Sequence, residues 1–376
     1  MRNCSATFTR FTAMLAVSLI AAACGDDVTA PPRNIAISAD RFGPPDALVA
    51  SGTSIQAAVD AAEPGDVIHI EPGTYLEGVV VAKRGLRLIG LGGPAAVVIE
   101  NPGTLDNGIT VTDVGDRFTL DNVTVRGFEE NGVFLIGVEH FHISRVITED
   151  NGEYGIFPVL SAFGTIEHSS ASGHSDTGIY VGQSRNVMIR HCTAFANVNG
   201  FEIENSSLVQ LTDSEAYGNT AGVLVVLLPG LTVKESARIE VLRNNFHDNN
   251  LPNFADPDDI AAAVPQGSGI LVVGTDKTRV KFNKVTGNEF VGIGVGSTLL
   301  LGALAALPPE AFADIEPNPD LTRIQHNVVT GNGATPPPLP LPLPGVDLLW
   351  DGSGVNNCWG GNTFDTSAPS PLPSCG

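Results

Sequence analysis

The sequence contains little positive charge. Among its 376 residues, 20 are Lys or Arg and 41 are Asp or Glu, which gives a formal net charge of −21. Nucleic acids and anionic lipid surfaces are bound by clustered Lys and Arg, so this balance excludes both as partners. It also disfavours a strongly anionic polysaccharide as a ligand. Charged residues make up only 16% of the chain against 43% hydrophobic residues, which excludes a disordered acidic polymer.

Aromatic residues and cysteines are scarce as well. Aromatics are 6% of the chain, whereas its 42 Gly and 26 Pro exceed ordinary usage, which favours many turns and short strands. None of the 5 Cys stands in a CxxC or Cys/His spacing typical of a zinc site, and we expect no cofactor. Cys358 and Cys375 lie near the C-terminus and can pair in an oxidising compartment.

The first residues form a targeting segment. Arg2 and Arg10 precede an apolar run, residues 11–23, that is too short to span a bilayer. The run closes on Ala-Ala-Ala-Cys, which resembles a bacterial lipoprotein signal in which Cys24 becomes the lipidated first residue. Ala21 departs from that signal, which usually has a larger aliphatic residue there, and ordinary secretion is the alternative. We therefore expect a signal peptide over 1–23, a tether over 24–50, and a protein of the bacterial cell envelope, lipid-anchored or secreted, whose only membrane contact is the anchor.

Most of the remaining chain is a tandem repeat with a period of about 23 residues. A Gly that precedes a short apolar run marks each copy; its members are Gly108, Gly132, Gly155, Gly178, Gly200, Gly222, Gly269 and Gly292. The step from Gly222 to Gly269 is about twice the others, and we take it as two periods. An extra coil with an expanded loop is therefore expected within 222–269. Such a coil cannot bury its apolar residues alone, and stacked coils share one core.

An amide column keeps the same phase as the glycines. Its members are Asn151, His174, Asn197, Asn219, Asn249, Asn288 and Asn332. Identical Asn side chains on stacked coils can hydrogen-bond along the stack and satisfy turn amides. Ahead of the repeat, Thr53 and Ser54 can N-cap a short helix that runs through Ala62 and covers the first sheet edge.

The repeated Asn…Gly-Ile coils and the opening Gly-Asp-Val-Ile-His-Ile-Glu-Pro-Gly-Thr-Tyr at residues 65–75 resemble right-handed parallel β-helix proteins of the pectate-lyase-like superfamily. Residues 178–186 and 200–205 resemble, more narrowly, a bacterial group of exported or lipid-anchored β-helix repeat proteins. The resemblance implies an all-β fold, a right-handed parallel β-helix solenoid of about 10 coils, each of roughly 22–24 residues. We expect it to span residues 51–333 behind the short capping helix. A Pro-rich C-terminal extension, residues 334–376, would follow and carry the Cys358–Cys375 disulfide.

Period-2 alternation in the Gly-Ile strands predicts a column of outward side chains. The column begins with Phe134, Phe157, Tyr180 and Glu202, and Glu204 lies on the same face. Aromatic rings can stack on sugars, while carboxylates bind hydroxyls or act as acid and base, so these five residues are candidates for substrate binding and the two glutamates for catalysis. Two alternatives are that a loop, 226–236 or 251–267, covers the aromatic rings, and that the glutamates are solvated surface carboxylates.

The resemblance also bears on catalysis. Mannuronan C-5 epimerases and related alginate lyases carry Tyr-Gly-x-Asp-Pro-His-Asp on such a strand, and residues 154–160 here read Tyr-Gly-Ile-Phe-Pro-Val-Leu. Phe157, Val159 and Leu160 replace both acids and the His, which disfavours an epimerase or lyase of that kind. The sequence leaves open whether the protein is an enzyme.

A second column follows another repeated motif and reads Arg145, His168, His191, Asp213 and Arg243. His168, His191 and Asp213 fall on adjacent coils, where two His and a carboxylate can bind a transition metal. The alternative is an exposed ladder of charges, whose two arginines would repel a cation.

The sequence thus yields competing functions. The first is a non-catalytic, exported β-helix that binds a polysaccharide or an envelope protein along the outward column. The alternative is a polysaccharide-modifying enzyme, namely a lyase, C-5 epimerase or glycoside hydrolase. A third is a structural spacer on a lipid anchor, which needs no site.

Overall fold

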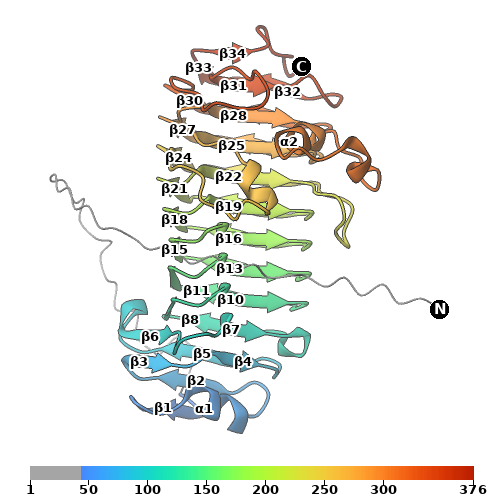
Figure 1. The fold of residues 1–376 in the computed structure, drawn as a ribbon. Coiled ribbons are helices and arrows are strands. Elements are labelled where there is room, and N and C mark those ends of the chain that lie inside the picture. The colour runs from blue at the N-terminus through green and yellow to red at the C-terminus, as the bar shows by residue number, and fades with distance from the viewer. Residues whose placement is uncertain (1–43) are drawn as a thin grey trace, which may run out of the picture. The chain divides into compact units, whose positions relative to one another are not determined.

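The computed structural model describes residues 44–376. The expected signal peptide, the lipidation site Cys24 and most of the expected tether lie outside these residues. Three parallel sheets of 12, 11 and 11 strands run the length of the described chain, and successive coils stack one above the other (Figure 1). The predicted all-β solenoid is therefore confirmed. No helix among residues 44–376 is long and apolar enough to cross a membrane.

Each sheet takes one strand from each coil. Sheet A contains β1 (Ala47–Val49), β2 (Val67–Ile70), β5 (Arg87–Gly90), β8 (Thr119–Asp121), β11 (His142–Ser144), β14 (Thr165–Glu167), β17 (Met188–Arg190), β20 (Gln210–Thr212), β23 (Glu240–Leu242), β26 (Arg279–Lys281), β29 (Arg323–Gln325) and β32 (Cys358–Gly360). Sheet B contains β3 (Gly73–Leu76), β6 (Val97–Glu100), β9 (Thr124–Arg126), β12 (Ile147–Glu149), β15 (Ser170–Ser172), β18 (Thr193–Phe195), β21 (Glu215–Tyr217), β24 (Asn245–His247), β27 (Lys284–Thr286), β30 (Val328–Thr330) and β33 (Thr363–Phe364).

Sheet C has the longest strands and carries the Gly-Ile motif. It contains β4 (Val79–Val81), β7 (Asn107–Val111), β10 (Asn131–Ile136), β13 (Tyr154–Val159), β16 (Thr177–Gly182), β19 (Asn199–Glu204), β22 (Ala221–Val226), β25 (Ser268–Val273), β28 (Val291–Gly296), β31 (Val346–Trp350) and β34 (Ser367–Ala368). The helices are α1 (Ile55–Ala61) and α2 (Thr298–Leu304), and the 3-10 turns are η2 (Pro94–Ala96), η3 (Asp113–Gly115), η4 (Ile260–Ala263) and η5 (Pro309–Phe312).

The core is one continuous column of apolar residues, mostly Val, Ile and Leu. Ile143, Ile166 and Ile189 pair in register on sheet A and are fully buried. Phe118, Phe201 and other fully buried rings belong to the same core. This shared core is what a single coil cannot build alone.

The bend between sheets A and B uses one residue per coil in the left-handed conformation. Arg145, His168, His191, Asp213 and Arg243 have φ between 50° and 56°. β-branched side chains disfavour this conformation because of steric clash at Cβ, and none of these five residues is β-branched. The second predicted column is therefore a column of bend residues between sheets A and B.

The amide column forms the predicted hydrogen-bonded ladder. Its Nδ2 groups donate to the Oδ1 of the next coil at 2.9–3.1 Å, from Asn197 through Asn219, Asn249 and Asn288 to Asn332. Asp347 accepts the last amide at 3.0 Å. His174 takes one place in the column, where its backbone N–H donates to Asn197 Oδ1 at 3.1 Å.

The prediction of an extra coil within 222–269 is wrong. β22 pairs directly with β25, so this segment forms a single coil whose two connections, residues 227–239 and 248–267, are enlarged. The Gly period alone could not distinguish a second coil from two long loops.

Both ends of the solenoid lie beyond the expected bounds. β1 lies inside the segment assigned to the tether, and it pairs with β2 of the first coil. Ser54 caps α1 by accepting from Ala57 N–H, and Ile55 and Val59 of α1 are buried, so this helix closes the first coil as predicted.

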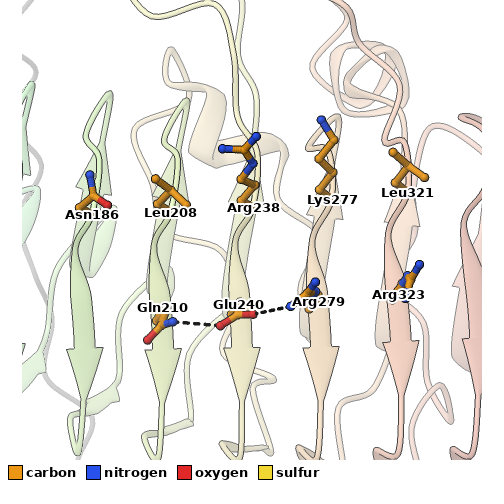
Figure 2. A pocket seen from close by; sticks show the side chains of 9 residues that line it. All are labelled: Asn186, Leu208, Gln210, Arg238, Glu240, Lys277, Arg279, Leu321 and Arg323. Atoms are coloured by element: carbon orange, nitrogen blue, oxygen red, sulfur yellow. Dashed lines mark hydrogen bonds and ion pairs between the residues drawn. The ribbon is translucent and has the colours of Figure 1, made fainter.

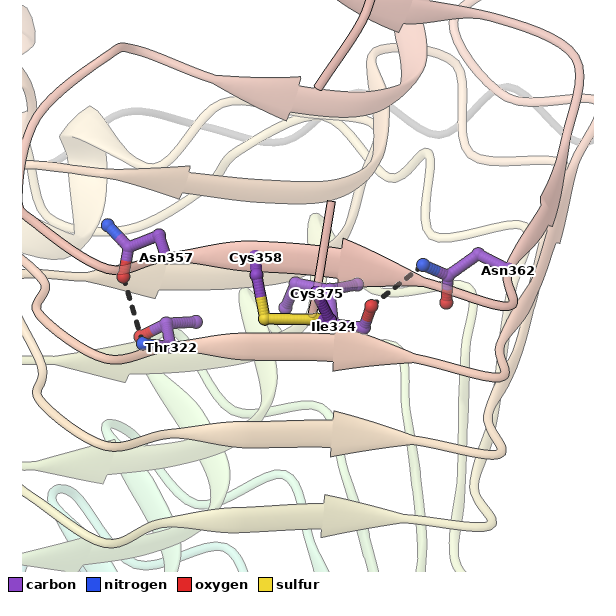
Figure 3. Close-up of a disulfide and its surroundings, with 6 residues drawn as sticks. All are labelled: Thr322, Ile324, Asn357, Cys358, Asn362 and Cys375. Carbon is purple, nitrogen blue, oxygen red and sulfur yellow. Dashed lines mark hydrogen bonds between the residues drawn. A yellow bond between two sulfur atoms is a disulfide. The ribbon is translucent and has the colours of Figure 1, made fainter. Parts of the chain in front are cut away.

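At the other end, β31 to β34 add a further coil where we expected an extension. Asn357 Oδ1 accepts from Thr322 N–H at 2.9 Å, and Asn362 Nδ2 donates to the Ile324 carbonyl at 2.7 Å (Figure 3). Cys358 of β32 and Cys375 form a disulfide that ties the terminal segment to this coil.

Candidate functional site on the outer face of sheet C

The outward column predicted for the Gly-Ile strands exists and begins with an aromatic stack. The Phe134 and Phe157 rings stack with centroids 5.3 Å apart, and Tyr154 stacks on Phe157 at 4.2 Å. Tyr180 meets the Phe157 ring edge-on at 4.7 Å. Phe134, Phe157 and Tyr154 are half-buried, so the first part of the stack presents ring surface to solvent.

The column changes character at Tyr180. Tyr180, Glu202 and Glu204 are only 4%, 5% and 8% exposed. The expectation that the two glutamates are solvated is therefore wrong. Farther along, Leu224 and Leu271 belong to a second apolar cluster outside the solenoid core, together with Val264 and Leu301 from the covering segments.

The segments that cover this part of the face were only partly predicted. A cavity of about 30 Å³ remains beneath them; its lining includes Leu228, η4 residues Ile260 and Ala261 with the adjacent Asp259, and Leu301 of α2. The covered-face alternative thus holds from Tyr180 onward, whereas Phe134 and Phe157 stay partly open. Both loops named from the sequence contribute to this cover, 226–236 through Leu228 and 251–267 through η4. The helix α2 adds a third covering element (Figure 1).

Three carboxyl groups meet beneath the cover. Tyr154 Oη donates to Asp176 Oδ2 at 2.7 Å, and Tyr180 Oη donates to Glu204 Oε2. The Thr177 hydroxyl lies 2.9 Å from Asp176 Oδ1 and 2.6 Å from Glu202 Oε2. Stacking brings these groups together, because Thr177 begins β16 and Glu202 lies in the middle of the neighbouring β19.

The Thr177 hydroxyl has one hydrogen, so it can make a full donor bond to only one of Asp176 and Glu202. A protonated carboxyl would satisfy the other contact by donating to the hydroxyl oxygen. Burial raises the pKa of Asp176 to about 7 and that of Glu204 to about 7. For Glu202, burial and then the neighbouring Asp176 and Glu204 hold the pKa well above its usual range.

Asp176 and Tyr154 were not among the predicted site residues. A signal for Asp176 exists in the sequence, since Glu130, Glu153 and Asp176 each precede the first residue of a sheet C strand on three successive coils. Burial, followed by repulsion from Glu130 and Asp259, raises the pKa of Glu153 as well. Tyr154 was noted only as a matching letter of the epimerase-like motif, not as a hydrogen-bond donor.

The predicted metal site is not formed. The His168 and His191 rings stack with centroids 5.0 Å apart, but both oxygens of Asp213 are bonded to Arg243, at 2.8 and 2.7 Å. Within residues 44–376, no group of three or more His, Cys, Asp or Glu is arranged to hold a metal ion. The charge-ladder alternative describes this column, because the flanking arginine neutralises the carboxylate.

Comparison with known proteins identifies the architecture. A family model described as a right handed beta helix region matches residues 107–250. The A-module of the Azotobacter vinelandii mannuronan C-5 epimerase AlgE6 superposes with a TM-score of 0.62 at 19% identity, covering 82% of this chain and 81% of that one. This chain is a right-handed parallel β-helix.

Other solved structures agree on the β-helix. The A-module of AlgE4, another mannuronan C-5 epimerase of Azotobacter vinelandii, has a TM-score of 0.59 at 18% identity and covers 84% of this chain and 93% of that one. A variant of the periplasmic alginate epimerase AlgG has a TM-score of 0.50 at 12% identity and covers 81% of this chain and 76% of that one. Among curated protein sequences, none matches this chain significantly. At these identities the likeness establishes the fold.

The segment compared with the epimerase motif lacks the acids and the His of that motif. Residues 154–159 form β13, and Phe157 packs between Phe134 and Tyr180 where the motif has an acid. An apolar ring can neither neutralise a uronate nor move its proton.

Proposed function

We propose that this β-helix is an exported protein that binds a polysaccharide on the outer face of sheet C, at the open rings of Phe134 and Phe157. The observation that carries the proposal is the stack of these rings, partly exposed and continuous with Tyr154. The apolar C–H face of a sugar packs on such a surface. Equivalent positions repeat along the stack of coils, as sugar units repeat along a linear polymer. The epimerase names of the similar β-helices agree with a polysaccharide ligand. Lipid anchoring at Cys24 and residence in the cell envelope are part of the same proposal.

Phe157→Ala tests the binding face. One aromatic contact of this kind contributes about 1.4 kcal/mol, so we expect polysaccharide affinity to fall about tenfold. The measurement is titration calorimetry against a panel of neutral and acidic polysaccharides. Phe282→Ala is the matched control, because Phe282 is 58% exposed and stacks on His326 at a bend away from sheet C. Equal losses in the two variants, or none in Phe157→Ala, would refute the assignment.

A polysaccharide-modifying enzyme is the second candidate, and the buried carboxyl cluster favours it. Carboxyls with a pKa of about 7 beside a tyrosine hydroxyl can exchange protons at neutral pH. The cover leaves a cavity of only about 30 Å³, which is too small for a sugar, so catalysis would require the loop that carries η4 to move.

We expect the wild-type protein to form no product from the polysaccharide that it binds. Unsaturated ends, new reducing ends and solvent hydrogen exchange at sugar carbons would be followed by absorbance, reducing-sugar assay and NMR. If product forms and Glu202→Gln abolishes it while binding persists, the protein is an enzyme and the binding-only proposal is wrong.

A further inference from the structure

A groove on a different face of the β-helix carries the opposite charge from the chain as a whole. It lies on the outer side of sheet A and has a volume of about 590 Å³. Its lining residues are Asn186, Leu208, Gln210, Arg238, Glu240, Lys277, Arg279, Leu321 and Arg323. Four cationic side chains thus face one carboxylate, although the whole chain has 41 acidic and 20 basic residues.

The lining side chains form two rows that follow the stack of coils. Figure 2 shows one row at the bends before the sheet A strands and a second row at the first residues of the strands. In the bend row, Arg238 and Lys277 stand side by side and point the same way, because Ala237 and Asp276 just before them pair as parallel bridge partners. The left-handed φ of 61° at Arg238 and 53° at Lys277 places both side chains outside the sheet.

Three of the four cations form no ion pair with the residues that the structure describes. Glu240 accepts from Arg279 at 3.1 Å and from Gln210 at 3.0 Å. Arg238, Lys277 and Arg323 form no ion pair with any acidic side chain among residues 44–376. Neighbouring coils are about 4.8 Å apart, so Arg238 and Lys277 lie next to each other in the bend row, and Arg323 lies in the strand row on the following coil.

Apolar and amide side chains lie on either side of the cations in this groove. Leu208 is 43% exposed and Leu321 is 39% exposed, and they flank Arg238 and Lys277 in the bend row (Figure 2). Asn186 and Gln210 offer amide groups at the end of the groove where Leu208 lies. A linear glycan that carries anionic substituents offers matching chemistry, namely regularly spaced charges, hydroxyls and apolar C–H faces.

We propose that this groove on sheet A is a second binding site, and that its ligand is a linear anionic glycan bearing sulfate or carboxylate groups. The site is independent of the aromatic face on sheet C, so the two proposals can fail separately. It also corrects the expectation from net charge: an excess of acids over the whole chain disfavours anionic glycans only where the acids lie, and here they are locally outnumbered.

The test compares dextran sulfate with uncharged dextran, which has the same backbone, on the full-length protein. We expect binding of dextran sulfate only, and weaker binding as the salt rises from about 0.1 M to about 1 M, because the screening length falls from about 10 Å to about 3 Å. In the double variant Arg238→Gln with Lys277→Gln, affinity should fall about five- to tenfold, since two solvent-exposed charge contacts to the ligand are lost.

Arg117→Gln is the matched control. Arg117 occupies the same left-handed bend position, with φ of 63°, before β8 and outside the groove. It should leave binding unchanged. Equal binding of dextran and dextran sulfate, an equal loss in Arg117→Gln, or no binding at all would overturn the proposal. Binding of phosphatidylglycerol vesicles or duplex DNA in preference to dextran sulfate would overturn it in favour of a membrane or nucleic-acid surface.

Discussion

Replacing Glu202 with Gln should stabilise the protein progressively as the pH rises from about 5 to about 8. The ordinary pKa of this side chain is 4.5, and burial with two neighbouring carboxyls holds it well above that in the folded chain. A raised carboxyl pKa contributes stability that is fully present below the unfolded value and is lost as the pH rises toward the folded one. Gln does not titrate, so the variant escapes this loss.

The expected difference in unfolding free energy between Glu202→Gln and wild type grows by up to about 1.4 kcal/mol per pH unit within that window. Across two units it should reach about 2 kcal/mol in favour of the variant, measured by urea denaturation at each pH. Glu63→Gln, at an exposed position beyond α1, should give a flat difference. A flat difference for Glu202→Gln too would mean that the Glu202 carboxyl is hydrated and ionised in the folded protein, contrary to its burial and raised pKa.

Asn249→Ala should destabilise the protein by about 3 kcal/mol. Asn249 Oδ1 accepts from the backbone N–H of Asn219 at 3.3 Å and from its Nδ2 at 2.9 Å. Asn249 Nδ2 donates to the Ala216 carbonyl at 3.2 Å and to Asn288 Oδ1 at 3.1 Å. Alanine leaves these buried partners unsatisfied, and each buried unsatisfied group costs about 1–3 kcal/mol.

Thermal and urea unfolding measure this loss, with Asn245→Ala as the control. Asn245 lies on β24 of the same coil, is half-buried, and its amide donates to Glu215 at 2.7 Å on the outer face. Its replacement should cost less than about 1 kcal/mol. Similar losses in both variants would show that the ladder contributes no more than a surface amide, and that the apolar core alone stabilises the stack.

The sheet C face shows how far sequence reasoning reached into the site. Because a fixed period places equivalent residues at the same register on each coil, Phe134, Phe157, Tyr180 and Glu202 could be assigned to one column, which the structure bears out. Their exposure could not be assigned. Tyr180 and Glu202 are buried because loops of unequal length fold back over them, and the path of such a loop depends on long-range packing that no repeat encodes.

Some errors have the same origin. The left-handed bend at His168 and His191 is a single residue wide, so period-2 alternation could not separate it from the strand before it. Asp213 is bonded to Arg243 from the next coil, a pairing set by side-chain conformation and not by spacing. The groove residues Arg238 and Lys277 lie on neighbouring coils, but an enlarged loop between them in the chain takes them out of the regular period.

The sequence by itself determined the parallel stack of coils, their register and the Asn ladder. Those features follow from residues that recur at one period, and stacking turns each recurrence into a contact with a copy of itself. Only the tertiary structure decided which part of the aromatic column stays open, which carboxyls meet beneath the cover, and where basic side chains outnumber acidic ones in a chain poor in positive charge. Burial, pKa and local charge depend on what the loops and neighbouring coils bring near a residue, and a repeat period carries no information about that.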